Sequence, residues 1–235
     1  MHQKKLKFSA FVLHRYPYQD SGFLLKIFSQ EAGLLTLVAA HAKRPKSAWY
    51  GILQPFQPLT IEVKGDGEVQ TLKQAEPNAP AYLLAGEVLW SGFYLNELLL
   101  AFLMPHDPYS NLFHVYQTTL QALQAGPSEK SLRLFELFLF REMGLLIDLS
   151  EEIEPDVYYQ LQAHRLPKPV SSDFARKLPS CFQGADLLAI HEAKLENEHI
   201  LKVAKRFSRL HLDFYLPKAR LKTREIFKSL ALQEN

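Results

Sequence analysis

The chain has 235 residues, of which 47% are hydrophobic and 22% are charged, a composition typical of a soluble globular protein. The longest nearly uncharged apolar run, Leu98–Pro105, is far shorter than the ~20 residues that span a bilayer, and the N-terminus lacks the apolar stretch of a signal peptide. A single cysteine, Cys181, excludes an internal disulfide and a cysteine-based zinc site. We therefore expect a cytoplasmic protein with no membrane segment.

The charge is unevenly distributed, although the net charge is only +2. Residues 1–76 carry 10 Lys/Arg against 6 Asp/Glu, residues 77–193 carry 7 against 14, and residues 194–235 carry 10 against 5. Two interpretations remain open at this point. The three segments form differently solvated surfaces, or the two basic ends attract a polyanion while the acidic middle faces something else.

The first 78 residues are predicted to form a small closed β-barrel. Two turn sequences, Gln30–Gly33 and Gly65–Gly67, separate apolar or alternating runs and place glycines where a positive φ is needed. The expected strands are residues 8–15, 23–28, 34–40, 59–64 and 69–72. Five short strands within about 70 residues are typical of a small barrel such as the OB fold.

After Pro77 and Pro80 the hydrophobic period becomes helical, so residues 79–235 are predicted to form an all-α domain, and the chain as a whole an α+β fold. The expected helices are residues 82–104, 109–124, 128–143, 185–192, 197–216 and 221–230. An irregular, proline-rich insert at about 145–184 is expected to contain at most short elements. Its acidic group, residues 148–156, matches no EF-hand pattern and is best interpreted as a solvated loop.

The sequence contains no recognisable catalytic motif. Glycine-rich phosphate loops, the zinc-protease motif and the nucleophile elbow are all absent, and the nine histidines show no ligand spacing. Cys181 beside Phe182 is interpreted as a small packed residue. We expect no catalytic residue, no cofactor and no bound metal.

A basic and aromatic segment lies between two strands of the predicted barrel. It contains Lys43, Arg44 and Lys46, followed by Trp49 and Tyr50. Cations of this kind neutralise phosphates, and aromatic faces stack on bases at ~1–3 kcal/mol each. The alternative is a solvated loop whose two aromatic residues are tucked into the barrel.

A second basic feature is a stripe opposite the apolar face of the predicted helix 197–216, continued by the residues that follow. The candidate phosphate-binding residues here are Lys202, Lys205, Arg206, Arg209, Lys218, Arg220, Lys222 and Arg224. Eight cations fall within 23 residues, with Asp213 the only acid among them. This density favours contact with a polyanion over a merely solvated face.

A third candidate is Arg133, on a predicted helix that is apolar nearly all round. It either pairs with Glu136 at i, i+3, or stands at the rim of an apolar groove. In the second case it would suit a peptide with an acidic, aromatic end.

Nine stretches of the sequence follow one another in an order typical of one protein family. They are residues 10–15, 37–39, 44–47, 53–59, 67–76, 92–99, 133–137, 204–207 and 221–227. In this order, from about residue 8 to residue 230, they resemble the RecO family of bacterial DNA repair proteins. The resemblance rests on the ordered series rather than on any single motif.

This resemblance implies an OB-fold domain over residues 1–78 and a helical domain over residues 79–235. It implies a recombination mediator that binds single- and double-stranded DNA and anneals complementary strands. It also implies contact with the acidic C-terminal tail of single-stranded DNA-binding protein, which Arg133 would anchor. Together with RecR, such a protein helps to load RecA onto coated DNA in the bacterial cytoplasm, on the nucleoid.

This chain differs from the family pattern in one respect. Many members hold zinc with four cysteines in the C-terminal half, whereas this chain has only Cys181. Residues 145–184 would then occupy that place without metal. Two competing hypotheses remain: an interaction adaptor with an OB fold and no direct DNA role, and an enzyme with an unrecognised site, which the lack of motifs disfavours. Salt-sensitive DNA binding separates the mediator from the adaptor.

Overall fold

The computed structural model of the chain describes residues 6–44, 46–147, 153–216, 221–223 and 225–226. The chain forms two compact units. Residues 1–127 and 221–235 make up the first unit, and residues 128–220 make up the second. The predicted boundary at residue 78 marks the change from strands to helices, whereas the first unit also includes two helices that follow the barrel.

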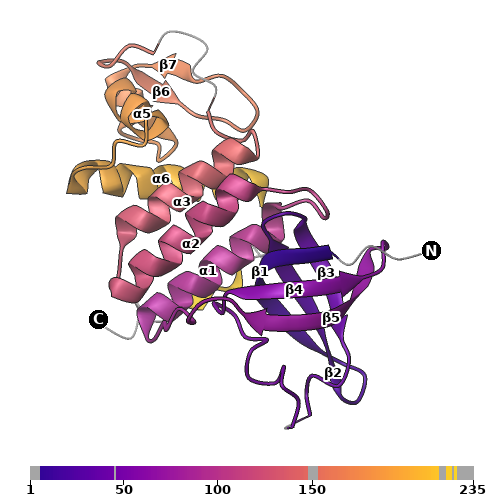
Figure 1. Ribbon diagram of the computed structural model, residues 1–235. Coiled ribbons are helices and arrows are strands. Elements are labelled where there is room, and N and C mark those ends of the chain that lie inside the picture. Colours follow the sequence, from indigo (N-terminus) through magenta and orange to yellow (C-terminus); the bar gives the residue numbers. More distant parts are fainter. Residues whose placement is uncertain (1–5, 45, 148–152, 217–220, 224, 227–235) are drawn as a thin grey trace. The chain divides into compact units, whose positions relative to one another are not determined.

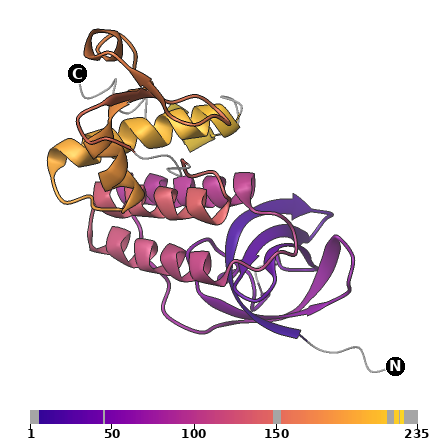
Figure 2. The same ribbon diagram turned by 90° about the horizontal axis from the view of Figure 1, so that it is seen from above.

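The first unit begins with a closed five-stranded barrel in the order β1-β2-β3-β5-β4 (Figure 1), the OB fold that the sequence predicts. Its strands are β1 Leu6–Tyr18, β2 Gly22–Ser29, β3 Gly33–Ala39, β4 Leu59–Lys64 and β5 Val69–Pro77. All pairs are antiparallel except β3 with β5. The barrel closes because β1 is long enough to pair with both β2 and β4, and a register shift between Val12 and His14 bends it. Figure 2 shows the strands curving around the barrel.

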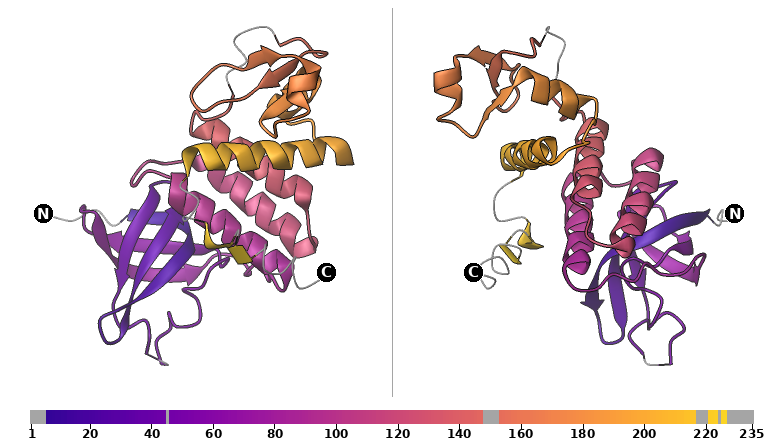
Figure 3. Two further views of the ribbon diagram at one scale, coloured as in Figure 1. Left: turned by 180° about the vertical axis from the view of Figure 1, so that it is seen from behind. Right: turned by 90° about the vertical axis from the view of Figure 1, so that its left-hand side faces the viewer.

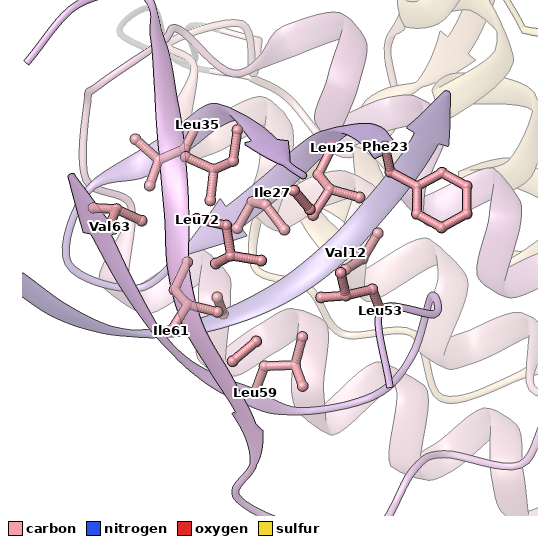
Figure 4. Packing of buried hydrophobic residues seen from close by; sticks show 14 of the residues in the cluster. Val12, Phe23, Leu25, Ile27, Leu35, Leu53, Leu59, Ile61, Val63 and Leu72 are labelled. Atoms are coloured by element: carbon pink, nitrogen blue, oxygen red, sulfur yellow. The ribbon is translucent and has the colours of Figure 1, made fainter. Parts of the chain in front are cut away.

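The barrel interior is filled by aliphatic side chains that alternate along the strands (Figure 4). They include Val12, Leu25, Ile27, Leu35, Ile61 and Leu72, and Leu53 from the loop before β4 adds to them. The opposite face of β1 is also buried. Phe11 packs against Phe113 and Tyr116 at centroid distances of 5.4 and 5.2 Å. Burial on both faces explains why residues 10–13 of this strand are uniformly apolar.

The two helices of the first unit are α1 Glu87–Phe102 and α2 Ser110–Ala125. The prediction that the first helix starts at residue 82 was wrong, because Gly86 adopts φ 59° and residues 79–85 run outside the helix. Asn96 on α1 donates from Nδ2 to the Leu13 carbonyl at 3.0 Å and accepts from the Tyr116 hydroxyl at 2.6 Å. One buried amide therefore connects α1, α2 and β1.

The turn before β3 requires glycine at position 33. Gly33 has φ +65°, and a Cβ at this position would stand 1.9 Å from the carbonyl oxygen of Asp107. Close by, the amide of His106 donates to the Leu34 carbonyl at 3.2 Å. Both the conformation and the close approach of the segment after α1 require glycine.

The second unit is largely helical and also contains a small sheet. Its helices are α3 Glu129–Glu142, α4 Ser172–Ala175, α5 Gly184–His191 and α6 Glu198–Tyr215, and its strands are β6 Tyr158–Gln160, β7 Lys168–Val170 and β8 Cys181–Gln183. The strands form an antiparallel sheet in the order β7-β6-β8, so the prediction of a purely helical domain needs this correction. Each strand has only three residues, too few for a periodic signal.

Helix α6, the long yellow helix in Figure 3, packs against α3 within this unit. Two predicted helix starts are confirmed by their caps. The Ser128 hydroxyl accepts from the amide of Ser131, and the Asn197 side chain accepts from the amide of Ile200. Of the helix predicted at 221–230, residues 224 and 227–230 lie outside the described residues. In the described part of the chain, no helix is long and apolar enough to cross a membrane.

Candidate nucleic-acid interface

The basic loop before β4 is held against the hairpin turn between β1 and β2. The amide of Lys43 donates to the Ser21 carbonyl at 2.8 Å, and the side chains of Ser21 and His41 form a hydrogen bond of 3.0 Å. Arg44 and Lys46 are exposed, and Lys43 is half-buried. Lys43 therefore lies at the end of the barrel where β1 turns into β2, and Arg44 and Lys46 follow it in the same loop.

The two predicted aromatic residues of this loop have different surroundings. Trp49 is half-buried and packs against the barrel core, whereas Tyr50 is 50% exposed. The structure thus shows the tucked arrangement for Trp49 and leaves Tyr50 as the aromatic face of the loop that a base could reach.

Sequence reasoning missed two further aromatic residues on the adjoining hairpin. Tyr16 and Tyr18 are 45% and 36% exposed, and the ring of Tyr16 lies 4.3 Å from that of His14. Residues 14, 16 and 18 share one face of β1 because side chains alternate along a strand. This alternation, together with the sequence Tyr-Pro-Tyr at the strand end, is the signal that could have identified them.

A fourth cation stands on the outer side of neighbouring strands. Lys26 of β2 is paired in register with Thr36 of β3 and donates to its hydroxyl at 2.9 Å. In OB folds the face of strands 2 and 3, the loop between strands 1 and 2 and the loop between strands 4 and 5 are the usual oligonucleotide contacts. We name the set formed by Tyr16, Tyr18, Lys26, Lys43, Arg44, Lys46 and Tyr50 the barrel surface.

The basic residues of the stripe on α6 have different partners within the second unit. Lys205 pairs with Glu129 of α3 at 3.1 Å. Arg206 donates to the Cys181 carbonyl at 3.1 Å, and its guanidinium lies 4.2 Å from the centroid of the Phe182 ring. Lys202 pairs with Glu198 at 2.6 Å on the open surface, and Arg209 is exposed. Lys205 thus contributes to packing, while Lys202 and Arg209 remain at the surface.

Of the four predicted basic residues after α6, the structure describes only Lys222. Lys218, Arg220 and Arg224 lie outside the described residues. Lys222 is exposed and belongs to the first unit, where its amide donates to the carboxylate of Glu97 at 3.1 Å. The amide and hydroxyl of Thr223 donate to the same carboxylate.

The position of Lys222 is also apparent in its effect on β1. Burial lowers the pKa of His14, and the charge of Lys222 lowers it further, whereas Glu97 raises it. Lys222 therefore acts on the strand that carries Tyr16. The structure brings this cation to the first unit, apart from the residues of α6 with which the sequence groups it.

Arg133 is buried in the second unit, with 6% of its surface exposed. It pairs with Glu136 at 2.9 Å and with Glu129 at 3.4 Å, and Glu136 is completely buried. Glu129 also forms an ion pair with Lys205. The intrahelical ion pair considered from the sequence is present, as part of a network that joins α3 to α6.

The described residues provide neither a metal-binding cluster nor an activated thiol. Among the described residues there is no group of three or more His, Cys, Asp or Glu side chains that could hold a metal ion. Cys181 is buried, and burial raises the pKa of its thiol, which disfavours the reactive thiolate. With one cysteine, the chain lacks the four-cysteine zinc site that the family resemblance would lead one to expect.

Comparison with known proteins connects both parts of the chain to one family. Residues 1–81 match the family model "Recombination protein O N terminal", and residues 85–225 match "Recombination protein O C terminal". The chain is 37% identical over 230 residues to the DNA repair protein RecO of Dechloromonas aromatica, covering 94% of each chain. It is 39% identical over 230 residues to that of Vibrio cholerae, covering 95% of this chain and 94% of the relative. It is also 39% identical over 223 residues to that of Coxiella burnetii, covering 92% and 95%. The chain therefore belongs to the RecO family of DNA repair and recombination proteins, which are recombination mediators rather than enzymes.

Proposed function

We propose that this protein binds DNA through the barrel surface, anneals complementary single strands, and helps to load recombinase onto DNA coated by single-stranded DNA-binding protein. The observation that carries the proposal is the hydrogen bond between Lys43 and Ser21, which joins the cationic loop to the hairpin carrying Tyr16 and Tyr18. Cations for phosphates and aromatic faces for bases then occur side by side, as single-strand binding requires.

The opposite loop of the barrel supports a particular path for the strand. The loop between β4 and β5 contains Asp66 and Glu68, both exposed. Two carboxylates repel a phosphate backbone at short range. A bound strand would therefore pass over the hairpin end of the barrel and the face of β2 and β3 rather than over this loop.

The test is the salt dependence of binding to a labelled single strand. We expect log Kd to change linearly with log salt concentration, with a slope of roughly 0.7 per phosphate contacted. Replacing Lys43, Arg44 and Lys46 together by Ala should weaken binding and make the slope shallower by about 2. The melting temperature should remain nearly unchanged, because exposed charges add little to stability.

A matched control removes three other exposed barrel cations, Lys7, Lys64 and Lys73, which lie on β1, β4 and β5. This variant loses the same charge and should keep most of the affinity. Equal losses in both triple variants would indicate a general charge effect and contradict a localised surface. Affinity that does not respond to salt would contradict electrostatic DNA binding altogether.

We also propose that Arg133 binds the acidic tail of single-stranded DNA-binding protein. Its guanidinium is already oriented by two carboxylates, and a planar fork binds a third better than an ammonium does. Arg133→Lys keeps the charge that balances Glu136 while removing the fork. We expect this variant to lose several-fold affinity for a labelled tail peptide, measured by fluorescence anisotropy, and to keep its DNA affinity. Unchanged peptide affinity would restrict Arg133 to the ion-pair network.

The loading step is proposed to involve RecR, with RecA reached indirectly, on the nucleoid in the bacterial cytoplasm. The second candidate function is an interaction adaptor, and the ion pair of Lys205 with Glu129 favours it, because this stripe cation serves packing. Binding to RecR that persists when DNA binding is lost at all salt concentrations would favour the adaptor.

A further inference from the structure

The second unit contains a hollow of about 620 Å³ that no part of the proposed barrel surface uses. All of its lining residues lie between residues 158 and 206, so it is formed within one unit. They come from the insert, from α5 and from α6. A volume of this size is within the range of pockets that bind small molecules.

The hollow is strongly cationic compared with the unit around it. Its lining includes Arg176, Lys177, Lys202 and Arg206, and a single acid, Asp186, which hydrogen-bonds His199 at 3.0 Å. Residues 128–220 as a whole carry 14 Lys/Arg against 14 Asp/Glu. Positive charge is therefore gathered at this concave site from a unit without net charge, and such a site attracts an anion.

One of these cations is fixed in place before any ligand arrives. Arg206 donates one hydrogen bond to the Cys181 carbonyl and lies over the ring of Phe182. A guanidinium has five N–H donors in a planar fork, a geometry that matches phosphate oxygens. Cation–π contact with the ring further limits how the fork can turn.

The other cations line the hollow from two elements that are distant in the sequence. Lys202 and Arg206 are four residues apart on α6 and share a helix face. Arg176 and Lys177 directly follow α4 in the insert, and both are exposed. Within the described residues neither of these two forms an ion pair with an acid. The insert thus adds two cations to those of the helix.

The remaining lining gives the hollow an apolar part. Tyr158, Leu178 and Val203 contribute to it, and an aromatic ring with aliphatic neighbours is the kind of surface on which a base packs. We propose that the hollow binds a nucleoside 5′-phosphate, either as a free nucleotide or as the 5′-terminal nucleotide of a DNA strand. A phosphate monoester carries more negative charge than a diester inside a strand, which suits the excess of cations.

The terminal form of this proposal rests on the proposed DNA binding, whereas the free-nucleotide form does not. The experiment uses the full chain and two 3′-labelled single strands of identical sequence, one with a 5′-phosphate and one with a 5′-hydroxyl. In parallel, deoxyadenosine monophosphate and deoxyadenosine are titrated calorimetrically. For a strand end, we expect the 5′-phosphate to bind at least five-fold tighter than the hydroxyl. For a free nucleotide, we expect the monophosphate to bind and the nucleoside not to bind.

Two variants locate the effect. Arg176→Gln combined with Lys177→Gln should abolish the preference for the phosphate in whichever form it is found. The matched control, Arg165→Gln combined with Lys168→Gln, removes two exposed cations of the same unit outside the hollow and should preserve it. Replacing Lys43, Arg44 and Lys46 by Ala should weaken the binding of both strands by the same factor. The ratio of the two affinities should remain unchanged.

The inference is overturned if both strands bind equally well and the monophosphate does not bind. It is also overturned if a phosphate preference survives the Arg176/Lys177 variant. Failure of the proposed function looks different, because then neither strand binds at any salt concentration.

Discussion

At the scale of single residues, Arg133 and Glu136 form a buried ion pair on α3. Glu136 is fully buried and Arg133 nearly so, and both lie on α3, whose other buried side chains are apolar. A buried charge without its partner is strongly unfavourable, whereas a paired one is nearly neutral compared with apolar residues. The pair therefore constrains which substitutions α3 tolerates.

We predict that Glu136→Leu lowers the free energy of unfolding by about 3 kcal/mol, because the buried Arg133 then loses its fully buried carboxylate partner. Combining Glu136→Leu with Arg133→Met should restore most of this loss. Urea unfolding measures both effects. Lys202→Ala, which removes an exposed i, i+4 pair, should cost less than about 0.5 kcal/mol, and a loss no larger than this in Glu136→Leu would contradict the buried-pair interpretation.

A second prediction concerns His211, which is buried on α6 with its ring 4.0 Å from that of Phe207. Burial lowers its pKa from 6.5 to about 4, partly opposed by a hydrogen bond to the backbone of Phe207. Between pH 6.5 and pH 4, His211 is therefore protonated in the unfolded chain but neutral in the folded chain. Stability from this group is thus complete above pH 6.5 and falls as the pH drops toward 4, by about 3 kcal/mol in total.

The corresponding measurement is urea unfolding at pH 7.5 and pH 5 for the native chain and for His211→Phe. The native chain should lose stability between these values, and the variant should lose about 2 kcal/mol less, since it has no proton to bind at this position. Identical losses in both proteins would show that His211 does not titrate in this range.

At the scale of elements, the barrel was predictable because its signals are local. Alternation of apolar residues and the glycines at 33, 65 and 67 mark strands and turns within a few residues of each other. The partners of the basic stripe were not predictable. Lys205 meets Glu129 across 76 positions of the sequence, and no periodicity reports such a contact. Arg176 and Lys177 were not predicted as part of a site either, because only the folded insert brings them next to the cations of α6.

The insert also shows how a small irregular element can be held by packing. Tyr159 of β6 and Cys181 and Phe182 of β8 are buried, and the sheet pairs Tyr159 with Phe182. A Cβ on Gly184 would stand 2.0 Å from the carbonyl oxygen of Glu154, so the backbone is closely packed where β8 leads into α5. These contacts hold the insert together by packing alone within the described residues.

We therefore predict that the purified protein contains no stoichiometric zinc and that a chelator leaves its melting temperature unchanged. Elemental analysis and thermal unfolding with and without EDTA provide the test. One equivalent of zinc, lost to EDTA together with the fold, would contradict this prediction, because structural zinc contributes folding free energy directly.

At the scale of the whole molecule, the chain leaves the first unit after residue 127, builds the second, and returns at residue 221. The return is fixed by the carboxylate of Glu97, which accepts from Lys222 and Thr223. Each unit carries a cationic site of its own, the barrel surface in the first and the hollow in the second. Annealing needs two strands with their charges screened, and we propose that these two cationic sites supply that screening without any catalytic group.

The most direct test of this account is the rate at which the purified protein anneals two complementary labelled single strands, with and without single-stranded DNA-binding protein bound to them. We predict that annealing is faster than the spontaneous reaction in both cases, slows as the salt concentration rises, and is strongly reduced when Lys43, Arg44 and Lys46 are replaced by Ala. An annealing rate equal to the spontaneous one at low salt, from a folded protein, would contradict it.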